Sequence, residues 1–350
     1  MESRLIRRLW FTIISVLRMN RFIHILNILL VVASCSRDVP VEVPESGLIS
    51  FRATVETKGV EVTQENLDHF YATALVARVP QPGEDEDINP VIDTFFENVE
   101  FSKAGDCYYS ETPYYRPAKR PMTFFLYYPS QQELGVNFNW NFRLDWSEGA
   151  ELPTIEWEEG EGVVLKDFSP KIKISEQVDL LYGFANMPDE EHWTSNEGDI
   201  EAVFIHTLAQ IEILAKSDNP NYQFKVAGVK IGNVTSKGDM MSAATDHWIL
   251  AEDIGEFSET YVENPVTLSN VDCSVMSPEG GNAFLLPQEL PENAYVAVYI
   301  RAYDVNNETW YPSETEYSWV SKNINGKWTA SEKYIYKLDF SDWSPSQVTE

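Results

Sequence analysis

Apolar and polar residues alternate along much of this chain, in short runs that turn-forming residues separate. The run Leu48–Val55 begins the pattern, with apolar residues at every second position: Ile49, Phe51, Ala53 and Val55. Because successive side chains of a strand point to opposite faces, this run predicts a strand that buries these residues. The same reasoning predicts further strands at residues 66–77, 94–101, 107–110, 122–128, 200–214, 222–231, 293–303 and 333–340.

Few segments have the 3.6-residue period of a helix, and residues 205–215 are equally compatible with a buried strand and with a helix. Many short strands separated by turns predict an all-β fold, built as a sandwich or a barrel. The chain has 350 residues, which favours two β-sandwiches in tandem over a single one. We expect an N-terminal sandwich at residues 47–190 and a C-terminal sandwich at residues 191–350.

The N-terminal segment reads differently from the rest. In residues 22–35, FIHILNILLVVASC, an apolar stretch ends in small residues directly before Cys35. This layout is typical of a secretory signal peptide, and it resembles the lipobox of bacterial lipoproteins, whose cysteine is acylated. The stretch is too short to span a membrane, which needs about 20 apolar residues. We therefore expect residues 1–34 to be a signal peptide and Cys35 to carry the lipid (palmitate), followed by a tether over residues 35–46.

Residues 1–18 have a basic start and an apolar patch of their own. They are either the first half of a two-part anchor or an upstream extension, in which case Met19 is the true first residue.

The overall charge limits the partners of the folded part. The chain has 26 basic and 55 acidic residues, a net charge of −29 at pH 7. Such a charge repels nucleic acid and anionic lipid surfaces, so we expect no nucleic-acid partner. Apolar residues make up 43% of the chain and aromatic residues 13%, enough to fill a core. Beyond Cys35, the remaining cysteines, Cys107 and Cys273, either form one disulfide or lie separately in the core.

Motifs of catalysis are missing from the sequence: it contains no H-E-x-x-H, G-x-S-x-G, phosphate-binding or dinucleotide-binding motif. We therefore expect no enzyme, no cofactor and no metal. His206 lies in an apolar strand and is predicted to form a hydrogen bond in the core, where the two domains join. His192 and His247 each precede a tryptophan and are read as packed loop residues. The acidic segment Gly83–Asp87 lacks the spacing of a calcium loop and is read as solvated.

Two alternative functions remain open. Trp140, Trp146 and Trp157 lie in a turn-rich region, and flat rings can stack on sugars, although aromatic residues more often fill sandwich cores. The first alternative is therefore a glycan-binding surface lipoprotein of the outer membrane. The second is a hydrolase with a facing pair of carboxylates, which only the abundance of acidic residues suggests.

Several segments together resemble a known family. They are residues 95–117 (FFENVEFSKAGDCYYSETPYYRP), 122–129 (MTFFLYYP), 177–182 (QVDLLY), 204–211 (FIHTLAQI), 284–288 (FLLPQ) and 328–336 (WTASEKYIY). In this order, and with the lipobox, they are similar to the fimbrillin-like lipoproteins of Bacteroidetes. In the last segment, Ser331 and Glu332 replace the family's usual glycine, so the turn there is expected to differ. The resemblance implies two tandem transthyretin-like β-sandwich domains after a lipoprotein signal peptide, in a protein of the outer membrane or of a fimbrium (pilus).

The resemblance also implies a mechanism of assembly and adhesion by β-strand exchange. In that family a protease removes the first strand, and the groove left behind accepts a strand from the next subunit. Here the exchanged strand would present Ile49, Phe51, Ala53 and Val55, and Arg52–Ala53 is a candidate cleavage site. Arg52 is equally compatible with an ordinary outward-facing position. The implied partners are other fimbrial subunits, the membrane through the lipid on Cys35, and host or bacterial surface ligands.

Overall fold

The computed structural model describes residues 47–56, 62–63, 65–78, 83, 91–117, 120, 122–135, 138–141, 143–145, 154–156, 162–187, 199–241 and 248–344. The expected signal peptide, Cys35 and the tether lie outside this part of the chain. So do His192, His247, Trp146, Trp157 and the acidic residues of the segment Gly83–Asp87. Within the described part, no helix is both long and apolar enough to cross a membrane.

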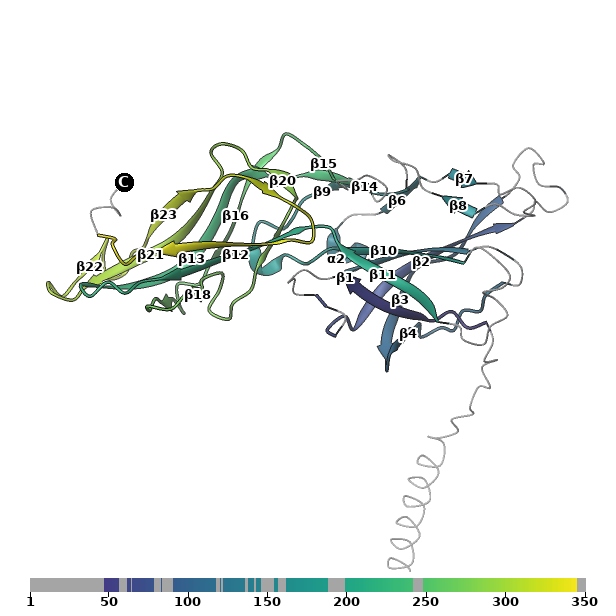
Figure 1. Ribbon diagram of the computed structural model, residues 1–350, viewed down its shortest axis with the longest axis horizontal. Helices are drawn as coiled ribbons and strands as arrows, with labels where there is room; N and C mark the ends of the chain where they lie inside the picture. The colour runs from purple at the N-terminus through teal and green to yellow at the C-terminus, as the bar shows by residue number, and fades with distance from the viewer. Residues whose placement is uncertain are drawn as a thin grey trace, which may run out of the picture. The chain divides into compact units, whose positions relative to one another are not determined.

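Seven strands between residues 51 and 206 close into a barrel, and β1 and β11 lie side by side in it (Figure 1). In barrel order they are β1 (Phe51–Glu56), β11 (Ile200–His206), β10 (Leu181–Met187), β5 (Met122–Tyr128), β2 (His69–Arg78), β3 (Val91–Ala104) and β4 (Cys107–Tyr109). The barrel thus takes in a strand, β11, that lies beyond residue 190. The division of the chain at that residue stays a prediction.

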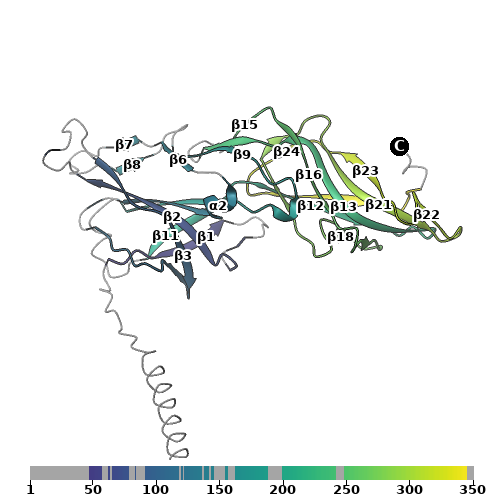
Figure 2. The ribbon, with the colours of Figure 1, turned by 180° about the vertical axis from the view of Figure 1, so that it is seen from behind.

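The C-terminal part contributes two further sheets, and in one of them the long strands β13 and β21 are paired neighbours (Figure 2). One contains β18 (Cys273–Ser274), β12 (Ala209–Lys216), β19 (Ala283–Leu285) and β25 (Lys333–Asp339). The other contains β16 (Ile254–Thr260), β13 (Tyr222–Thr235), β21 (Tyr295–Asp304), β22 (Thr309–Tyr311), β17 (Val266–Thr267) and β23 (Ser318–Asn323).

Smaller elements complete the described part. A four-stranded sheet contains β15 (Trp248–Leu250), β14 (Gly238–Met241), β9 (Gly162–Phe168) and β6 (Phe138–Asn141). Two strand pairs are β20 (Gln288–Glu289) with β24 (Lys327–Trp328), and β7 (Arg143–Asp145) with β8 (Thr154–Glu156). Among the described residues, helical structure is limited to α2 (Gln131–Leu134) and the 3₁₀ turn η1 (Ile174–Glu176). The predicted all-β class is confirmed, and residues 205–215 form strands rather than a helix.

Strand β5 contributes side chains to two hydrophobic clusters, one on each of its faces. Its residues 122–127 are all buried, which explains why the sequence reads as a continuous apolar run rather than an alternating one. Phe124 points into the barrel core, with Phe51 and Phe101. Phe125 points to the other face, where it joins a second cluster with Trp248 of β15. The two C-terminal sheets enclose a third cluster with side chains from both, as in a β-sandwich.

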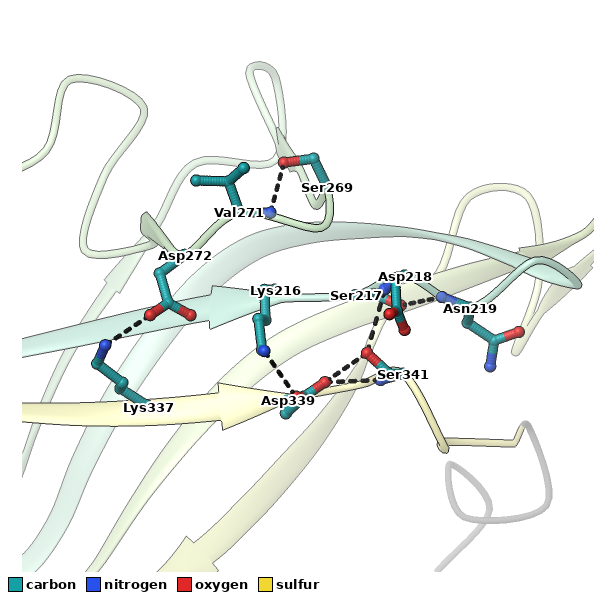
Figure 3. A network of polar contacts seen from close by, with 10 residues as sticks. All are labelled: Lys216, Ser217, Asp218, Asn219, Ser269, Val271, Asp272, Lys337, Asp339 and Ser341. Atoms are coloured by element: carbon teal, nitrogen blue, oxygen red, sulfur yellow. Dashed lines mark hydrogen bonds and ion pairs between the residues drawn. The ribbon is translucent and has the colours of Figure 1, made fainter.

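Strand β25 runs parallel to β12, and polar side chains fasten its end (Figure 3). Lys216 Nζ lies 3.1 Å from Asp339 Oδ2, and Ser341 Oγ donates to Asp339 Oδ1 at 2.6 Å. The bonds from Ser341, with the charge of Lys216, lower the pKa of Asp339 to about 2. Closer to the middle of β25, Lys337 Nζ donates to Asp272 Oδ2 at 2.6 Å. These contacts hold the last strand of the described chain against its neighbour.

Candidate functional site

The first strand, β1, occupies a place in the barrel between β11 and β4. It pairs in parallel with β11 through every residue, from Phe51 opposite Ile200 to Glu56 opposite Ile205. On its other side, β4 contributes a single pair, Phe51 opposite Tyr108. Within the described part of the chain, backbone bonds from Ile49 N to Tyr114 O, 2.8 Å, and from Arg116 N to Gly47 O, 2.6 Å, extend this side only toward the N-terminus. The barrel therefore has a weak seam beside the C-terminal half of β1.

The inward face of β1 fills the barrel core, as the alternation predicts. Ile49 is 1% exposed, Phe51 0%, Ala53 2% and Val55 7%. The Phe51 ring packs edge-to-face on Phe70, Phe101 and Phe124, with ring centroids 5.5, 4.9 and 5.3 Å away. Edge-to-face pairs of aromatic rings are favourable beyond the burial of their surface. The barrel thus holds a shaped pocket for one aromatic side chain of its first strand.

The outward face of β1 makes polar contacts that the alternation does not predict. Ser50 is 6% exposed, and its hydroxyl donates to Asp199 Oδ1 at 2.7 Å. The Arg52 guanidinium donates to Asp199 Oδ2 at 3.1 Å, and the Cys107 thiol of β4 donates to the same oxygen at 3.0 Å. Asp199 directly precedes β11. One carboxylate therefore contacts β1 and β4 from the start of β11.

These contacts shift the protonation of the groups that make them. Partial burial alone would raise the pKa of Asp199, but hydrogen bonds from Cys107 and Ser50 and the charge of Arg52 lower it overall. Burial, and then the bond to Asp199, raises the pKa of Cys107 above its ordinary value. At neutral pH the cluster therefore contains a carboxylate, a guanidinium and a protonated thiol. A thiol in this state is a hydrogen-bond donor and a poor nucleophile.

The candidate cleavage site lies in the middle of a paired strand. Arg52 has an exposed side chain, whereas Ala53 is buried. A pocket of about 390 Å³ opens beside this bond, lined by Arg52, Ala53, Lys103, Asp106 and Tyr108. Among its described lining residues, Asp106 supplies the one carboxylate. Among the described residues, no group of histidine, cysteine and acidic side chains could hold a metal ion.

His206 has the structural role that the sequence predicts. Its side chain is fully buried, and Nδ1 lies 2.7 Å from Asp179 Oδ2, which is itself 2% exposed. It ends β11, and Ser331 Oγ donates to its carbonyl oxygen at 2.7 Å. The next residue, Thr207, accepts a bond from Trp248 Nε1 at 2.8 Å. His206 is thus a buried, hydrogen-bonded residue between the barrel and the sheet of β12.

The two cysteines in the described part of the chain are free: Cys107 contacts Asp199, and Cys273 lies in β18 beside Ala215. The disulfide that the sequence left open does not form.

A row of aromatic and basic side chains covers the outward face of β21 and its neighbours. The ring of Tyr299 stacks on Trp319 at 4.9 Å, and Lys230 Nζ lies 4.9 Å from the Trp319 centroid. The Arg301 guanidinium lies between Trp310, at 4.4 Å, and Tyr317, at 4.7 Å. These rings thus contact one another and the cations beside them, while Trp319 stays 38% exposed. The tryptophans on which the glycan alternative depends have side chains outside the described part.

Comparison with known proteins identifies the family. The model of the fimbrillin-like family matches residues 79–350, more than half of the chain. No curated protein matches it. A solved fimbrial protein from Bacteroides vulgatus is 14% identical, covering 83% of this chain and 95% of its own, with a TM-score of 0.48. A candidate cell adhesion protein from Bacteroides ovatus is 13% identical, covering 85% and 94%, with a TM-score of 0.46. On the strength of the family match, this chain belongs to the fimbrillin-like family.

Proposed function

We propose that this chain is a surface lipoprotein that acts in fimbria assembly or cell adhesion, without catalysis, and that it assembles by exchanging β1. Cys35 carries the lipid that attaches it to the outer membrane, and other fimbrial subunits are its partners. Membership of the fimbrillin-like family supports the role in fimbriae and the surface location. The solved relatives described as fimbrial and cell adhesion proteins point the same way.

The observation that supports strand exchange is the way β1 is held. It fills the barrel with alternate apolar side chains, including the fully buried Phe51, yet on the β4 side it has one strand pair. An open sheet edge accepts a strand from another chain through main-chain hydrogen bonds, and pockets for alternate side chains fix its register. Loss of β1 would uncover both features along β11. The groove would then accept a strand with the same spacing of apolar residues.

A truncated chain tests the exchange. A chain that begins at Thr57 lacks β1, and a chain that begins at Ser36 retains it. We expect the shorter chain to self-associate in light scattering, or to bind a peptide of residues 47–56, while the longer chain stays monomeric. A peptide of the same composition in scrambled order is the control. Monomers in both cases, with no binding of the 47–56 peptide, would refute exchange through this strand.

The membrane anchor is tested separately. Changing Cys35→Ala removes the only side chain that the lipobox offers for acylation. We expect the variant to accumulate as unprocessed precursor and to take up no labelled fatty acid in cells. Continued labelling and membrane attachment of the variant would show that the anchor lies elsewhere.

A further inference from the structure

The Asp199 carboxylate joins the three strands that meet at the seam of the barrel. Its Oδ1 accepts from Ser50, and its Oδ2 accepts from both Arg52 and Cys107. Ser50 and Arg52 lie on either side of Phe51, the residue that forms the single pair with β4. The carboxylate therefore bonds to β1 on both sides of that pair and reaches β4 as well.

We propose that Asp199 is a latch: it holds β1 in the barrel and shields the Arg52–Ala53 bond from proteases until β1 opens. This inference rests on the proposed function, in which β1 is released. It adds the residue that controls the release. Asp199 acts as a positioning residue, because it touches the strand to be released and takes no part in any reaction.

The shielding follows from what a protease needs. A protease that cuts after arginine binds an extended, unpaired segment and places the guanidinium against a carboxylate of its own. In the folded chain, Arg52 already contacts Asp199, and the backbone of β1 pairs with β11 throughout. Cleavage therefore requires β1 to open and Arg52 to leave Asp199. When opening and closing are fast, the cleavage rate follows the population of the open form.

An ordinary surface ion pair would not have this effect. Such pairs contribute little, because both side chains stay in water. Here the Asp199 side chain is 25% exposed, although that of Arg52 is 60% exposed. The hydroxyl of Ser50 and the thiol of Cys107 also donate hydrogen bonds to Asp199. The exposure of Arg52 to water does not weaken these two bonds. The latch thus depends on three donors from two strands, and removing the carboxylate frees all of them.

Limited digestion of the full chain with trypsin tests the latch. Mass spectrometry would quantify the fragment that begins at Ala53. We expect Asp199→Asn to raise the initial rate of this cut by about tenfold or more, since three bonds to a charged group are weakened together. The matched control is Asp93→Asn, which removes the partner of Arg78 in the same barrel. It should leave the cut after Arg52 within about twofold of the wild-type rate.

A second pair of variants keeps the test decisive if Asp199→Asn fails to fold. Cys107→Ala removes one donor and should also speed the cut, whereas Cys107→Ser keeps a donor and should resemble the wild type. Hydrogen exchange in β21 would show that the C-terminal sheets are intact. Equal cutting after Arg52 in the wild type, Asp199→Asn and Cys107→Ala, or no cut there in any of them, would overturn the latch.

The outcomes separate the latch from the proposed function. Faster cutting in Asp199→Asn would support the latch, and strand exchange would be judged by the chain that begins at Thr57, because the fragment that begins at Ala53 keeps four residues of β1. Unchanged cutting would refute the latch, and strand exchange would still be judged by the chain that begins at Thr57.

Discussion

The pocket for Phe51 leads to a quantitative prediction about strand exchange. If the chain that begins at Thr57 binds a peptide of residues 47–56, the peptide should restore the contacts of β1. Changing Phe51→Ala in the peptide removes a ring that is fully buried and packs edge-to-face on Phe70, Phe101 and Phe124. The change therefore acts on a single pocket and leaves the main-chain pairing of the peptide intact.

The magnitude follows from these contacts. Burial of a phenylalanine contributes about 1.5–3 kcal/mol, and each edge-to-face pair adds roughly 0.5–1.5 kcal/mol. Truncation of a buried phenylalanine to alanine in protein cores costs about 3–5 kcal/mol, in line with these values. Because every 1.4 kcal/mol or so is tenfold in affinity, we expect the dissociation constant to rise roughly a hundred- to several-thousand-fold.

Isothermal titration calorimetry or fluorescence anisotropy would measure the binding. The matched control is a peptide with Thr54→Ala, since Thr54 is exposed on the opposite face of β1. It should bind within about threefold of the parent peptide, because exposed substitutions rarely exceed about 0.5 kcal/mol. If the Phe51→Ala peptide also binds within threefold of the parent peptide, the Phe51 pocket contributes little to binding. The proposal that this pocket fixes the register of the bound strand would then be refuted.

Three further predictions concern the barrel and its join. His206→Leu removes the hydrogen-bond partner of the buried Asp179 side chain, so it should cost about 1–3 kcal/mol in urea unfolding, and adding Asp179→Leu should recover part of the loss. Gly183→Ala would place a methyl group 2.4 Å from the carbonyl oxygen of Val203, so it should lower the melting temperature. An unchanged melting temperature would contradict this prediction. Asp199 lies near Arg52, Cys107, Tyr109 and Arg116, and its pKa is lower in the folded than in the unfolded chain. The stability that its carboxylate adds is therefore fully present above the unfolded pKa of about 3.9. It is lost as the pH falls through the lower pKa of the folded chain. The difference in urea midpoint between the wild type and Asp199→Asn should therefore close below about pH 4.

The strands themselves were predictable from local pattern. The alternation in Leu48–Val55 predicts which side chains of β1 are buried, because only one face of a strand can point into the barrel. The hairpin of β3 and β4 was also predictable, since the Gly105–Asp106 turn lies between two such runs and Gly105 has the positive φ that the turn requires. Local pattern succeeds here because the face to which a strand residue points, and the form of a tight turn, depend only on residues close in sequence.

The candidate site was only half predictable, because its polar part joins distant residues. Ser50 falls on the outward face by alternation, yet it is buried by Asp199, which lies 149 residues away. Nothing around Asp199 marks it, since acidic residues are abundant throughout the chain. The sequence around Cys107 likewise left open only whether this cysteine is free or in a disulfide, and it did not indicate a contact with Asp199. The sequence pattern predicts on which face of a strand a residue lies. It does not predict the residue's partner on that face, because that depends on which strands the fold brings together.

The direction of pairing is the second feature that the pattern could not supply, and it constrains any donor strand. Parallel neighbours cannot be joined by a tight turn, so β1 has no hairpin to its partner β11. Side-chain pockets, main-chain bonds and Asp199 hold β1 in place. No short loop joins it to β11, so another strand could take its place without breaking a hairpin.

A donor strand would have to run parallel to β11. It would need an aromatic residue where Phe51 lies and small or branched apolar residues two and four positions later. A donor that ran the opposite way could form main-chain bonds, but its side chains would meet the pocket of Phe51 at a different height and angle. Under the proposed strand exchange, the barrel would therefore select a donor by direction as well as by sequence, and successive subunits would share a single head-to-tail orientation.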